Sequence, residues 1–140
     1  MLLEDHPASH VVFPINETRL ADNAVDPAIV PLVRALILVG FGTLYSCSGH
    51  PEKLGEAKPV FPYVVFRAPQ SKVETLRGIL QRVAGRVLEI RPDGADGWRL
   101  CATTEMERKM TVRDIQALFD KLVDGLAPAV EAAQRKAAQA

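Results

Sequence analysis

The sequence is poor in the residues that build disulfide frameworks, metal clusters and membrane spans. Its 140 residues include two cysteines, three histidines and one tryptophan, and aromatic residues make up only 6%. Two cysteines are too few for a disulfide framework, and we expect both to be thiols in a reducing cytosol. No apolar run reaches the ~18–20 residues that a membrane span needs. The N-terminus also lacks the basic-then-apolar order of a signal peptide. We therefore expect a cytoplasmic protein with no membrane partner.

The chain also lacks net charge, because its 17 basic residues balance its 17 acidic ones. This balance gives no support to broad electrostatic binding of RNA, DNA or an anionic membrane, although it allows a local basic patch. Hydrophobic residues at 48% and charged residues at 24% are ordinary values for a globular protein. A chain of this length buries roughly two-thirds of its surface when it folds. We expect one domain over residues 1–140.

Three helices are predicted from caps and periodicity. Asp26 is a good N-cap, Pro27 suits the first helical position, and the apolar spacing that follows runs to Gly40 or Gly42. A capping box of Ser71 and Glu74 predicts a second helix that ends at Gly85. For the third helix, the expected features are a capping box of Thr111 and Asp114, a break at Gly125 and Pro128, and a helical tail over residues 126–140.

Short apolar or alternating runs predict four strands, at residues 43–45, 63–66, 86–91 and 98–103. The order of helices and strands indicates an α+β fold, with a mostly antiparallel sheet of about four strands and helices packed on one face. We expect irregular structure over residues 1–24, an exposed loop over residues 51–62 and a solvated connection through the charge run at 105–109.

The segment from Ser46 to His50 concentrates polar chemistry at the end of a predicted strand. It reads Ser46-Cys47-Ser48-Gly49-His50. Glycine allows a sharp turn and a close approach of the backbone to a ligand, and consecutive N–H groups in such a turn can bind an anion. The pattern predicts a site for a small anionic or nucleotide-like molecule, and Arg67 or Arg99 would pair with its charge.

Each reactive residue of this segment has an alternative role. Cys47 and His50 fit a thiolate–imidazolium pair, with His50 as acid or base, and Cys47 equally fits a buried small hydrophobe. Two ligands do not complete a zinc site, which needs three or four. A metal would need Cys101 or a histidine near the N-terminus, His6 or His10, as a further ligand. A strand arginine such as Arg67 or Arg99 often only extends toward solvent.

The segment from Asp22 to Val33, the apolar helix after it and the run Thr43–His50 also resemble a known family. They are similar to the N-terminal part of the wybutosine-synthesis TYW3-like family. Its members share an aspartate-led polar segment, a valine-aspartate helix start and a strand ending in serine-cysteine-serine-glycine. The family has a basic residue after that glycine, where this chain has His50. The resemblance implies S-adenosylmethionine as cofactor and methyl transfer to a modified guanosine in tRNA.

Three functions therefore stand as alternatives. The first is a domain that binds a small or nucleotide-like ligand at the Ser46–His50 segment. The second, which rests on the resemblance, is an S-adenosylmethionine-dependent methyltransferase-like enzyme in which Ser46 and Ser48 position the substrate. The third is a protein-interaction domain that works through the alanine-rich tail, and a homodimer through this tail is a further expectation.

Overall fold

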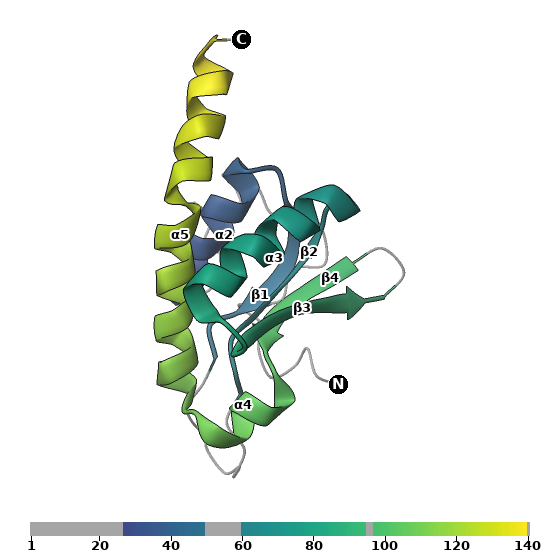
Figure 1. Cartoon of the computed structure of the whole chain (residues 1–140), viewed down its shortest axis with the longest axis vertical. Helices are drawn as coiled ribbons and strands as arrows, with labels where there is room; N and C mark the ends of the chain where they lie inside the picture. The colour runs from purple at the N-terminus through teal and green to yellow at the C-terminus, as the bar shows by residue number, and fades with distance from the viewer. Residues whose placement is uncertain (1–26, 50–59, 95–96, 140) are drawn as a thin grey trace.

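The computed structural model describes residues 27–49, 60–94 and 97–139. Four antiparallel strands form one sheet in the order β1-β2-β4-β3. Helices α2, α3 and α5 pack together with one face of this sheet (Figure 1), which confirms the α+β fold. The elements in chain order are η2 (Pro27–Ile29), α2 (Val30–Leu38), β1 (Gly42–Cys47), β2 (Tyr63–Arg67), α3 (Gln70–Ala84), β3 (Leu88–Asp93), β4 (Gly97–Ala102), α4 (Thr104–Lys109) and α5 (Val112–Gln139).

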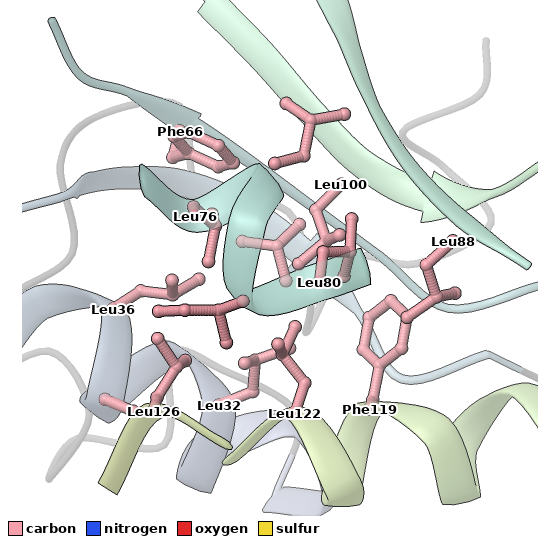
Figure 2. Packing of buried hydrophobic residues seen from close by; sticks show 14 of the residues in the cluster. Leu32, Leu36, Phe66, Leu76, Leu80, Leu88, Leu100, Phe119, Leu122 and Leu126 are labelled. Atoms are coloured by element: carbon pink, nitrogen blue, oxygen red, sulfur yellow. The ribbon is translucent and has the colours of Figure 1, made fainter. Parts of the chain in front are cut away.

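The hydrophobic core lies between the helices and this inner face of the sheet. The sheet contributes side chains such as Phe66 and Leu100, which meet leucines from all three helices (Figure 2). Phe66 also packs edge-on against Phe41, with 5.1 Å between the ring centroids. Burying each such leucine or phenylalanine stabilises the fold by roughly 1.5–3 kcal/mol. The alternation of inward and outward side chains along the strands therefore fixes which face the helices cover.

The register of the strands defines two ends of the sheet. At one end, Cys47 pairs with Tyr63, which pairs with Cys101. We call this the Ser48 end, because β1 leads into Ser48 there. At the opposite end Gly42 pairs with Arg67, and the β3–β4 hairpin turns between Asp93 and Gly97. We call this the Arg67 end.

The two predicted capping boxes have different outcomes. The Thr111–Asp114 box is confirmed: Asp114 Oδ2 accepts from the Thr111 N–H at 3.0 Å, and Thr111 Oγ1 accepts from the Asp114 N–H at 3.1 Å. The Ser71–Glu74 box is wrong, because α3 begins one residue before Ser71 and its N-cap, Pro69, makes no side-chain cap. Glu74 instead accepts from the side chains of Gln70 and Arg77.

The predicted break in the last helix is also wrong, because α5 continues through Gly125 and Pro128 to Gln139. Pro128 is exposed, so the backbone carbonyl that loses its partner lies where water can reach it. Gly125 faces α3, where an added Cβ would lie 2.7 Å from Val83 Cγ2. This glycine therefore permits a close helix–helix approach instead of ending the helix.

Other boundaries shift by a few residues. Ser46 and Cys47 belong to β1, which the sequence placed at 43–45. β3 and β4 cover 88–93 and 97–102, where 86–91 and 98–103 were predicted. The charge run at 105–109 forms the short helix α4, capped by Thr103 Oγ1, which accepts from the Met106 N–H at 3.2 Å. None of the residues of α4 is buried, so the run is solvent-exposed as expected although it is helical.

Candidate functional site

The strand β1 separates the predicted site residues onto its two faces. Ser46 pairs with Val64 and lies in the core with no exposed surface, and its Oγ has no hydrogen-bond partner within the described ranges. Cys47 points to the outer face of the sheet and is equally buried. Ser48 follows at the end of the strand and is 6% exposed. Ser48 borders a cavity.

Gly49 closes the segment tightly. Its φ is +88°, and an added Cβ would lie 2.9 Å from each of Val60 O, Pro62 Cδ and Val112 Cγ1. The Gly49 N–H donates to Cys47 Sγ at 3.3 Å, and Gln116 Nε2 donates to Ser48 O at 2.7 Å. An anion-binding nest needs free N–H groups, and the Gly49 N–H is already directed at sulfur. Ser48 and Gly49 are therefore held by the start of α5 and by residues 60–62.

A cleft of about 120 Å³ opens beside Ser48. Its polar side chains are Ser48, Gln116 and Asp120, where the last two lie one turn apart on α5. Gln116 Oε1 and the Asp120 carboxylate have no hydrogen-bond or ion-pair partner in the part of the chain that the structure describes. The apolar wall comes from Ala28, Ile29, Pro62 and Phe119. One signal for this pair is present in the sequence: Gln116 and Asp120 are polar residues at i, i+4 spacing on a helix, and each directly follows a core residue, Ile115 and Phe119.

The two cysteines lie on the outer face with Tyr63 between them in the register. Two strand spacings separate their Cα atoms by about 9–10 Å, which exceeds the ~7 Å limit for a disulfide. Burial raises the pKa of Cys101 from 9.0 to about 11, partly offset by the charge of Arg91. Cys101 is therefore a neutral thiol at neutral pH and not an activated nucleophile.

The predicted arginines do not join the Ser48 cleft. Arg99 lies on the outer face, where its Nε donates to Asp93 Oδ2 at 2.9 Å and its guanidinium stacks on Tyr63 at 4.4 Å. Arg67 is exposed at the other end of the sheet. The five residue steps of β1 from Gly42 to Cys47 span roughly 16 Å. One small ligand at Ser48 therefore does not reach Arg67.

Two other hollows lie away from Ser48. One, of about 660 Å³, is at the Arg67 end. The other, of about 320 Å³, is apolar and lies between α3 and α5, where it is lined by Phe41, Leu76, Ile79 and Leu126. This groove lies near the turns of α5 that extend past the other helices (Figure 1). A protein partner that binds the helical tail would contact this groove.

Metal binding gains no support from residues 27–49, 60–94 and 97–139, which contain no group of three or more potential ligands among histidine, cysteine, aspartate and glutamate. The histidines His6, His10 and His50 lie outside these ranges, and so does the predicted acid–base role of His50. No helix in the described ranges has both the length and the apolar character to cross a membrane. Comparison with protein-family models, curated proteins and solved structures gives no match.

Proposed function

We propose that this chain is a small-molecule-binding domain whose site is the Ser48 cleft. The observation that carries the proposal is a cavity beside Ser48 whose lining includes two acceptors with no partner among the described residues, Gln116 Oε1 and the carboxylate of the exposed Asp120. Gln116 donates its amide N–H to Ser48 O, which holds its side chain at the cleft. The cleft therefore offers hydrogen-bond acceptors from α5, and the hydrogen bond between Gln116 and Ser48 holds the first of them in place.

The chemistry of the cleft favours a ligand with an amino or amidinium group. Asp120 contributes a negative charge, which attracts a cation and repels the anion expected from the sequence. Hydrogen bonds to a charged group contribute about 1.5–3 kcal/mol each. A volume of about 120 Å³ equals roughly four water molecules at ~30 Å³ each. It suits a small amine, or the amino end of a larger ligand, and not a whole nucleotide.

The methyltransferase alternative rests on the resemblance over residues 22–50. S-adenosylmethionine is much larger than the Ser48 cleft, so only its amino-acid end would fit there. We include it as a separate arm of the test, together with S-adenosylhomocysteine, because an enzyme of this class binds both. Saturable binding of either compound would favour the enzyme over the simple binding domain.

The test is a titration of the full chain followed by two-dimensional NMR. Ethanolamine and guanidinium are the cationic probes, and acetate at equal ionic strength is the anionic comparison. Fragments of about four heavy atoms bind with at most ~1.5 kcal/mol per atom, so the titration extends through the millimolar range. We expect saturable shifts of the Ser48, Gln116 and Asp120 amides with the cations and none with acetate.

Two matched variants test whether the Asp120 carboxylate binds the cationic probe. Asp120→Asn removes the carboxylate of the cleft and should weaken ethanolamine binding at least tenfold. Asp124→Asn removes an exposed carboxylate one turn further along α5, outside the cleft, and should leave binding unchanged. Equal weakening by both variants, or no saturable shift in the wild type, would refute the proposed site.

A further inference from the structure

The hollow at the Arg67 end is more than five times as large as the Ser48 cleft, at about 660 Å³ against about 120 Å³. Its size falls within the ~300–1,000 Å³ typical of ligand sites. The end of β2, the start of α3 and the adjoining ends of β3 and β4 form it, and Figure 1 shows the start of α3 and these strand ends on the same side of the molecule. It is lined by Arg67, Ala68, Pro69, Pro92, Gly94, Gly97 and Trp98.

Arg67 gives this hollow a positive charge that no described residue neutralises. Its side chain is exposed and forms no ion pair or hydrogen bond within the described ranges. By contrast, Arg77, Arg91 and Arg99 each pair with a carboxylate. The other described lining residues are uncharged, so none of them repels an anion.

Trp98 gives the same hollow a fixed aromatic surface. The Arg77 guanidinium lies 5.4 Å from the centre of its ring, and Arg77 is itself held by Glu74 and by Ile90 O, the latter at 3.0 Å. The Trp98 indole N–H has no hydrogen-bond partner among the described residues. Arg77 covers part of the ring and Trp98 also packs against the core, so a ligand meets only the ring surface that lines the hollow. Stacking of a planar ring on such a surface contributes about 1–3 kcal/mol per base in single-stranded nucleic-acid sites.

We propose that this hollow binds a nucleoside monophosphate, with the base against Trp98 and the phosphate at Arg67. A guanidinium binds a phosphate with two parallel hydrogen bonds, which fixes its orientation. The start of α3 adds to the same field, because its N-cap Pro69 makes no side-chain cap and its first turn has no acidic residue. The site rests on the hollow and the side chains of Arg67 and Trp98, and it is separate from the Ser48 cleft.

The experiment uses the fluorescence of Trp98, which is the single tryptophan of the chain. Adenosine 5′-monophosphate is titrated into the full chain, and adenosine and ribose 5-phosphate serve as half-ligands. We expect saturable quenching by the nucleotide and at least tenfold weaker quenching by adenosine. Ribose 5-phosphate should not quench but should compete with the nucleotide. No saturable quenching by the nucleotide at millimolar concentration would overturn the proposal.

Variants distinguish the role of the Arg67 charge in nucleotide binding from a general effect of losing a surface arginine. Arg67→Ala should weaken the nucleotide at least tenfold and leave adenosine unchanged, and Arg67→Lys should be intermediate, because an ammonium group does not match the phosphate in two places. The control is Arg82→Ala, which removes an exposed arginine near the other end of α3. Equal quenching in the wild type and Arg67→Ala would overturn the proposal. Asp120→Asn should leave nucleotide binding unchanged, so this site and the Ser48 cleft succeed or fail separately.

Discussion

The Ser48 end and the Arg67 end of the sheet use similar residue types in opposite ways. Each has a glycine with a positive φ, Gly49 at +88° and Gly94 at +74°. At the Ser48 end an added Cβ would meet three atoms at 2.9 Å, whereas at Gly94 it would meet nothing within 4 Å. At the first end the Gly49 N–H and Ser48 O are used by the fold, whereas the Arg67 guanidinium and the Trp98 indole N–H at the second have no partner among the described residues. A segment rich in polar chemistry in the sequence is therefore not by itself an open site.

The largest predicted effect tests this contrast directly. Gly49→Ala should lower the free energy of unfolding by about 2–5 kcal/mol, because it adds a left-handed backbone penalty of ~1–2 kcal/mol to an overpacking cost of ~1–3 kcal/mol. Gly94→Ala carries only the backbone penalty, because its surroundings are open. Urea denaturation of both variants measures the difference. If the two substitutions cost the same, the Ser48 end is not the packed end.

The second prediction concerns burial at the Ser48 end. Burial raises the pKa of Cys101 from 9.0 to about 11, so the folded chain holds this proton more tightly than the unfolded chain does. The stabilisation from the bound proton is complete below pH 9 and is lost as the pH rises to about 11. At 1.36 kcal/mol per pKa unit, the loss amounts to about 2–3 kcal/mol over that window.

The measurement compares the wild type with Cys101→Ala by urea denaturation from pH 8 to pH 11.5. Lysines and tyrosines titrate in both proteins, so their effect cancels in the difference. The stability advantage of the wild type should shrink by about 2–3 kcal/mol across the window. Parallel curves would mean that the outer face at Cys101 is open to water, like the Arg67 end.

Features that depend on a local sequence pattern could be predicted, whereas features that depend on contacts between distant residues could not. Apolar periodicity predicted α2, α3, α5 and the four strands of the sheet, because burial of a face is a local pattern repeated along each element, whereas the exposed α4 has no such pattern. It did not predict that Ser46 would face the core, which depends on the pairing of Ser46 with Val64. Gln116 and Asp120 lie about 70 residues from Ser48 in the sequence, as the Gln116–Ser48 separation of 68 shows. Only the docking of α5 brings them beside the Ser48–Gly49 turn.

Long-range contacts also decided the breaks and caps. Gly125 and Pro128 look like a helix end in isolation, but packing of Leu122 and Leu126 in the core carries α5 past them. Ser71 and Glu74 have the spacing of a capping box, but the chain enters α3 one residue earlier. Within a helix a glycine costs about 1 kcal/mol and a proline about 3 kcal/mol, which burial of two leucines at roughly 1.5–3 kcal/mol each offsets.

The smallest predicted effect compares the two predicted caps, one at each end of the sheet. Thr111→Ala removes the hydroxyl that accepts from the Asp114 N–H at the start of α5 and should cost about 1 kcal/mol. Ser71→Ala removes a side chain that caps nothing at the start of α3 and should change stability by less than ~0.5 kcal/mol. The backbone N–H of Thr111 is the main cause of the lowered pKa of Asp114, and Thr111→Ala keeps it, so the wild type should keep most of its advantage as the pH falls through that pKa. Urea denaturation at pH 7 and pH 3 measures both effects.

Because α5 holds Val112 against Gly49 and Gln116 against Ser48, Thr111→Ala should also weaken ethanolamine binding at the Ser48 cleft, whereas Ser71→Ala should not.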